Sequence, residues 1–142
     1  MLTIDTNDMS ISITRGDYAA IVFSAVDDEG NDWDPETANV DTLTFAVAKK
    51  FGDEPLISVS NVYDGQDEEA FWTIEIGATG SNDWYKKDSS GNVIYKDGEP
   101  VLIDFGNYVW DLQLTTSSGK STIIGKSDEY SPKFRVWGEV AE

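Results

Sequence analysis

Apolar and polar side chains alternate along most of this chain, and this period of two constrains the fold more than any other feature. In residues 108–115 every second side chain is large and apolar: Tyr108, Trp110, Leu112 and Leu114. A β-strand places successive side chains on opposite faces of a sheet, so such a segment buries one face and exposes the other. The sequence therefore predicts an all-β fold.

The same alternation recurs in several other short segments, which are separated by residues that favour turns. These segments are residues 9–13, 18–26, 42–47, 56–61, 71–76, 121–126 and 133–140. Short strands at regular spacing, with no convincing amphipathic helix between them, are typical of two packed sheets. We predict one domain over residues 1–142, an immunoglobulin-like antiparallel β-sandwich of about seven to nine strands.

One long connection, at about residues 78–105, interrupts this rhythm. It is rich in Asn, Asp, Ser and Gly, and its segments 93–95 and 101–103 are predicted to pair as a small hairpin across residues 96–100. Connections of this length are uncommon in compact domains and often carry function. An insertion that merely extends two strands is the alternative, and the sequence leaves both interpretations open.

Composition excludes several classes of chemistry. The chain contains no Cys and no His, which removes thiolate metal sites, Cys nucleophiles and Ser-His-Asp triads. We predict a protein that is not an enzyme and has no cofactor. The net charge is −17, from 27 acidic and 10 basic residues. Such a surface repels nucleic acids and anionic membranes, and it suits cations, a basic partner or solubility.

The termini and the acidic loop give weaker signals. No apolar run approaches the roughly 20 residues that span a bilayer, and the amino terminus lacks the regions of a signal peptide, so we expect synthesis in the cytoplasm. The segment Asp27–Asp34 is rich in carboxylates, but an EF-hand counted from Asp27 would need Gly at the sixth position and Glu at the twelfth, where Ala38 stands. A solvated loop is favoured, and Ca²⁺ binding stays open. Arg15-Gly16-Asp17 is favoured as a hairpin turn over a receptor-binding tripeptide.

Aromatic residues outside the apolar faces are the candidates for a contact surface. Trp72 and Trp110 lie on apolar faces and are expected in the core, whereas Trp137 is out of phase with Phe134 and Val136. Exposed aromatic side chains are favoured at protein interfaces. The predicted interface residues are Trp33, Trp84, Tyr85, Tyr95 and Trp137.

The order of these strands resembles that of small β-sandwich modules from the tail and baseplate of tailed bacteriophages. The segments that carry the resemblance are 11–17, 43–50, 55–57, 72–76, 122–125 and 134–140, together with the most specific one, Gly106-Asn107-Tyr108-Val109-Trp110-Asp111-Leu112-Gln113-Leu114. They are most similar to the amino-terminal domain of baseplate upper proteins. The resemblance implies an immunoglobulin-like fold and a virion component, made in the cytoplasm of the bacterial host, that docks to other virion proteins or forms a homo-oligomer. The insertion at residues 78–105 departs from the short turn of those modules.

Two other functions stay open at this point. The charge of −17 suits an acidic decoy that mimics DNA and inhibits a basic nucleic-acid-binding protein, although the acidic residues are scattered through many loops. A carbohydrate-binding sandwich that uses Trp33 and Trp84 is the third hypothesis. We expect an assembly or docking module with no nucleic-acid or membrane partner.

Overall fold

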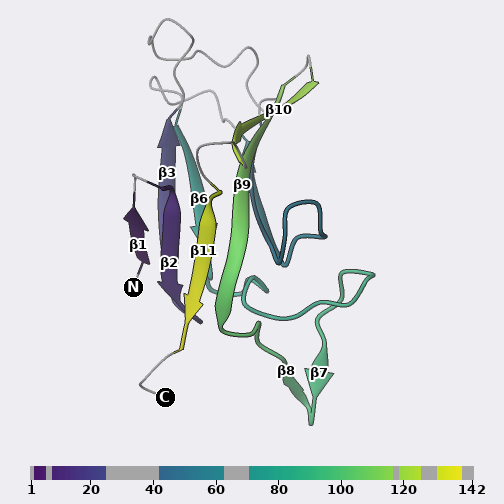
Figure 1. Ribbon diagram of the computed structural model, residues 1–142. Helices are drawn as coiled ribbons and strands as arrows, with labels where there is room; N and C mark the ends of the chain where they lie inside the picture. The colour runs from purple at the N-terminus through teal and green to yellow at the C-terminus, as the bar shows by residue number, and fades with distance from the viewer. Residues whose placement is uncertain are drawn as a thin grey trace, which may run out of the picture.

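A computed structural model describes residues 2–5, 8–24, 42–62, 71–116, 119–125 and 131–138, and within these ranges the fold is all-β, as predicted (Figure 1). The described residues form eleven strands and no helix. The strands are β1 (Leu2–Asp5), β2 (Ser10–Thr14), β3 (Ala19–Ser24), β4 (Thr42–Ala48), β5 (Ile57–Val62), β6 (Phe71–Ile76), β7 (Tyr95–Lys96), β8 (Glu99–Pro100), β9 (Gly106–Thr116), β10 (Gly119–Ile124) and β11 (Lys133–Trp137).

A seven-stranded sheet forms most of the molecule. Six of its strands follow the order β1-β2-β11-β9-β4-β5, and the seventh, β10, also pairs with β9. The long strand β9 pairs with β4 along one edge, and its other edge pairs first with β11 and then with β10. Every pairing among these strands is antiparallel except that of β2 with β11, which is parallel. It pairs a strand from the beginning of the sequence with one from its end. A second sheet contains β3 and β6.

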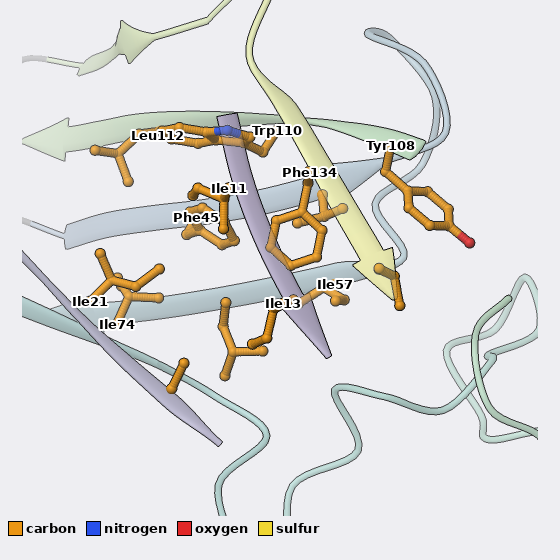
Figure 2. Packing of buried hydrophobic residues seen from close by; sticks show 14 of the residues in the cluster. Ile11, Ile13, Ile21, Phe45, Ile57, Ile74, Tyr108, Trp110, Leu112 and Phe134 are labelled. Atoms are coloured by element: carbon orange, nitrogen blue, oxygen red, sulfur yellow. The ribbon is translucent and has the colours of Figure 1, made fainter. Parts of the chain in front are cut away.

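The two sheets enclose one hydrophobic core, which makes the arrangement consistent with a β-sandwich. Phe45 of β4 is fully buried, with its ring centroid 5.3 Å from that of Trp110 and 6.0 Å from that of Phe134. Ile21 and Ile74, from the second sheet, belong to the same buried cluster (Figure 2). Aromatic contacts at these separations add to the free energy gained from burial. The immunoglobulin-like connectivity stays a prediction.

Burial follows the alternation that the sequence shows. In β9, the four apolar residues from Tyr108 to Leu114 are buried, and in β4 Leu43, Phe45 and Val47 are buried. The pattern is weakest in β5, where Ile57 is buried but Asn61 of the same parity is exposed. Trp110 lies in the core as predicted, and the side chain of Trp72 is outside the described part of the chain.

The insertion forms a small β structure of its own and does not extend β6 or β9. Its hairpin pairs β7 with β8 around a turn at Asp97-Gly98, which is tighter than the predicted five-residue connection. Residues 84–88 pair with residues 92–94 and with residues 101–103, through the bridges Lys87–Val93 and Tyr85–Leu102. The insertion lies at the end of the sandwich where β11 ends and β9 begins (Figure 1).

Candidate docking surface

Trp137 is presented to solvent at the end of β11, in agreement with the phase of its strand. Phe134 and Val136 are buried, whereas Trp137 is 61% exposed. The backbone of Trp137 is fixed, because its carbonyl oxygen accepts a hydrogen bond of 2.9 Å from the amide of Arg15. A large aromatic side chain therefore projects from a rigid strand end.

A second exposed aromatic ring lies beside this strand end. Phe105 is 52% exposed, and it packs over Gly138, where an added Cβ would come within 3.1 Å of the ring. The guanidinium carbon of Arg15 lies 3.9 Å from the centroid of the Phe105 ring, a cation–π contact. We call Arg15, Phe105, Trp137 and Gly138 the Trp137 patch. Its aromatic and Arg side chains are the types that are enriched in protein interfaces.

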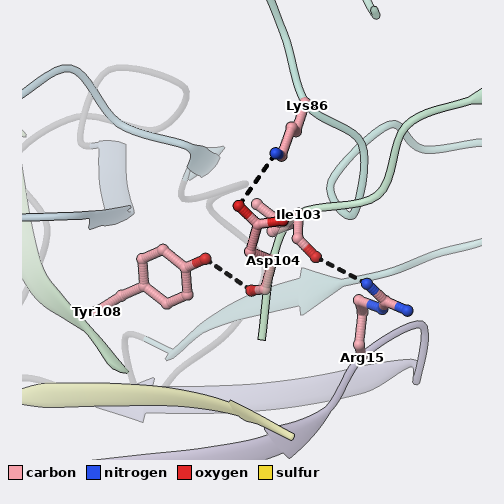
Figure 3. Close-up of polar contacts among 5 residues, drawn as sticks. All are labelled: Arg15, Lys86, Ile103, Asp104 and Tyr108. Carbon is pink, nitrogen blue, oxygen red and sulfur yellow. Dashed lines mark hydrogen bonds and ion pairs between the residues drawn. The ribbon is translucent and has the colours of Figure 1, made fainter. Parts of the chain in front are cut away.

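Two polar contacts fix the end of the insertion against the sandwich, and a third lies within the insertion (Figure 3). Arg15 donates from Nη1 to the carbonyl of Ile103 at 3.1 Å, and the Tyr108 hydroxyl donates to the carbonyl of Asp104 at 2.6 Å. The Asp104 carboxylate pairs with the Lys86 ammonium at 3.0 Å. Burial raises the pKa of Tyr108, and the negative charge of Asp104 raises it further. Phe105 follows Asp104 directly, so these contacts also hold its position.

Trp84 is buried, so the prediction that it belongs to an exposed contact surface is wrong. Only 6% of it is exposed, and its indole Nε1 donates to the carbonyl of Asp17 at 2.9 Å. Gly77, with φ of 73°, permits this approach, because an added Cβ would lie 2.6 Å from the Trp84 nitrogen and would overlap the Asp17 carbonyl. A position in a polar connection does not reveal burial that depends on contacts with a distant turn.

The other predicted interface residues are distributed over the insertion or lie outside the described residues. Tyr95 is 65% exposed on β7, next to the hairpin turn, and Tyr85 is half-buried. Neither residue belongs to the Trp137 patch. Trp33 and the acidic loop Asp27–Asp34 fall outside the described residues. Among the residues that are described, no group of acidic side chains is arranged to hold a metal ion.

Arg15-Gly16-Asp17 forms a turn, as predicted, but the predicted hairpin is wrong, because β2 and β3 belong to different sheets. Gly16 has a φ of 91°, and the Asp17 amide donates to the Thr14 carbonyl at 3.1 Å. The Arg15 side chain lies on Phe105 and Ile103, where it belongs to the patch.

Sequence reasoning missed Phe105, although a signal for it exists. Phe105 directly precedes β9 and differs in parity from Tyr108 and Trp110, so continuing the alternation of that strand by one residue would have predicted an exposed side chain, although the chain bends at Phe105 in the structure. The same parity argument identified Trp137. The contact of Arg15 with Phe105 joins residues far apart in the chain, and no local pattern predicts it.

Comparison with known proteins adds no further information. No protein-family model matches the chain, and neither a curated protein nor a solved structure matches it. Within the described ranges, no helix is long and apolar enough to cross a membrane.

Proposed function

We propose that this protein is a structural component of a bacteriophage virion, of the tail or baseplate type, that acts as an assembly or docking module without catalysis. The Trp137 patch carries the proposal: two exposed aromatic side chains, Phe105 and Trp137, and the Arg15 guanidinium are grouped around one fixed strand end. Aromatic and Arg anchors of this kind dominate the free energy of protein association. The strand order that resembles phage tail modules supports the same function.

A second copy of the chain is the partner to test first. Because the contact rests on aromatic side chains, its stability should depend little on salt, unlike attraction between exposed charges, which is screened over about 10 Å at 0.1 M salt. We expect a discrete oligomer that persists at high salt. An anchoring Trp contributes about 2 kcal/mol or more, so Trp137→Ala should weaken association roughly 30-fold.

The experiment is light scattering after size exclusion, at low and high salt, on the wild-type chain, Trp137→Ala and a control. Val22→Ala is a matched control, because Val22 is 60% exposed on β3, in the other sheet. The proposal expects an oligomer for the wild type and for Val22→Ala and dissociation for Trp137→Ala. Self-assembly through this patch is refuted if Trp137→Ala retains the wild-type mass, or if the wild type is a monomer under all conditions.

The acidic decoy is the second candidate, and the net charge of −17 favours it. Its binding to a basic nucleic-acid-binding protein would collapse as the salt concentration rises. Trp137→Ala would leave that binding unchanged. A complex that is captured from bacterial lysate at low salt only, and equally well by Trp137→Ala, would support the decoy over the virion module.

A further inference from the structure

A pocket of about 270 Å³ lies where the insertion meets the sandwich. Its lining comes from three parts of the chain: the connection between β4 and β5, the insertion, and the first half of β9. Only the fold brings these parts together. The volume lies just below the range of about 300–1,000 Å³ that is typical of ligand sites, so the pocket suits one small ligand.

Part of the lining is apolar. Ile103 and Tyr108 belong to the hydrophobic core, and Leu56 packs against it. The fourth apolar residue, Ile94, is 39% exposed. Its backbone is fixed, because its amide donates to the carbonyl of Lys86 at 2.9 Å. An apolar ligand group in the pocket would therefore remove the Ile94 side chain from water, which is favourable.

The charged residues of the lining are mostly cations. Three of the 10 basic residues of the chain line this pocket, Lys49, Lys86 and Lys87, against one acidic residue, Asp104. The Asp104 carboxylate pairs with the Lys86 ammonium at 3.0 Å (Figure 3). The lining is therefore positive in a chain whose net charge is −17, and the surplus cations are Lys49 and Lys87. Such a local excess of positive charge favours a negatively charged ligand.

Lys49 is the surplus cation that is available to a ligand. The Lys87 ammonium already donates to the carbonyls of Asn82 and Tyr85, at 2.8 and 3.2 Å. The Lys49 ammonium lies 5.6 Å from the centroid of the Tyr108 ring, which lines the pocket. Among the described residues, this ammonium has neither a hydrogen-bond acceptor nor an ion-pair partner. Its three N–H donors can therefore meet an acceptor that a ligand supplies.

An apolar wall beside an available ammonium selects an anion that carries an apolar group. A neutral ligand would gain nothing from the charge of Lys49, and a cation would be repelled by the positive lining. We propose that this pocket binds a small organic acid with one aromatic or branched aliphatic group, and that its carboxylate pairs with the Lys49 ammonium. The apolar group of the acid then contacts Leu56 and Ile94. The pocket shares no residue with the Trp137 patch.

The test is an NMR titration of the full chain with benzoate, phenylacetate and isovalerate, at constant ionic strength. Each acid is added to about 50 mM, well above a Kd of about 1 mM. At least one should cause saturable amide shifts in residues 86–87, 94 and 103–104. The amide of the same acid has nearly the same shape and no charge, and it should bind about threefold more weakly or less. The proposal is overturned if no acid causes such shifts, or if acid and amide bind equally.

Lys49→Met is the matched variant, because it removes the ammonium and keeps an unbranched side chain. Lys50→Met is its control, since it removes the same charge one residue away, outside the lining. Both side chains are exposed, so both variants should fold, and circular dichroism checks this. Binding should weaken about threefold in Lys49→Met, as expected for an exposed ion pair, and stay unchanged in Lys50→Met.

Wild-type affinity in Lys49→Met, or an equal loss in the two variants, contradicts the pairing with Lys49. Trp137→Ala should bind the acid as the wild type does. Loss of self-association in Trp137→Ala bears only on the docking module, so the two proposals fail independently.

Discussion

Replacing Trp84 by alanine should destabilise the protein far more than replacing Trp137 by alanine. The same side chain is removed in both variants, but Trp84 is 6% exposed and Trp137 is 61% exposed. Deleting a buried Trp costs about 3–5 kcal/mol. The lost hydrogen bond to the Asp17 carbonyl adds about 1 kcal/mol. The Trp137 variant should stay within about 0.5 kcal/mol of the wild type, as exposed substitutions do.

Urea unfolding followed by circular dichroism measures this difference without relying on tryptophan fluorescence, which both variants change. Whole domains are stable by about 5–15 kcal/mol, so the loss in Trp84→Ala removes much of that stability and a milder variant is needed as well. Trp84→Phe keeps an aromatic ring and removes the N–H donor, and it should lose about 1–3 kcal/mol. Equal losses for Trp84→Ala and Trp137→Ala would refute the burial argument, and an unchanged Trp84→Phe would refute the contribution of the hydrogen bond.

Three further predictions concern single positions. In urea unfolding, Gly77→Ala should lose clearly more stability than Gly80→Ala. Both glycines have a positive φ, but of these two only Gly77 lacks room for a Cβ. Equal losses of stability in the two variants would contradict this. In Tyr108→Phe, the free energy of unfolding should fall less steeply above pH 10 than in the wild type. Because the pKa of Tyr108 is raised, the native state still holds this proton when the unfolded state has released it, and the wild type loses stability as the pH rises through that window. Parallel pH curves for the two proteins would contradict the shift. The stability of Asp111→Asn relative to the wild type, measured by thermal unfolding, should be higher at pH 7 than at pH 3. The pKa of the native Asp111 carboxyl group is raised, so the native state binds this proton more tightly than the unfolded state, and the wild type loses stability as the pH rises above 3.8. A stability difference that does not change with pH would argue against this.

Much of the fold was predictable because strand faces are a local property. The parity of Tyr108, Trp110 and Leu112 fixed the buried face of β9, and the same reasoning placed Trp137 outside the core. The insertion was located by its turn residues, and its hairpin was predicted with a looser turn than the Asp97-Gly98 turn of the structure. The strand Leu2–Asp5 was missed, because four residues give too short an alternation to recognise.

The candidate sites were predictable only in part. Trp137 was identified by its position in the strand alternation. The cation–π contact between Arg15 and Phe105 joins residues that are far apart in the chain, and the sequence did not predict it. The groove beside Asp111, on the outward face of β4, β5 and β9, was not predicted at all. A carboxylate on the outward face of a strand is ordinary in an acidic protein, and only the small residues opposite it on β4 and β5 create the space.

By itself, the sequence determined which side chains each strand turns inward, because alternation depends on neighbours in the chain and on the geometry of an extended backbone. It also determined the chemistry that is unavailable, since a chain without His or Cys has no imidazole or thiolate to use. The tertiary structure decided how distant segments meet: the parallel pairing of β2 with β11, and the burial of Trp84 against Asp17. These contacts depend on the spatial arrangement of whole strands, and no local pattern encodes that arrangement.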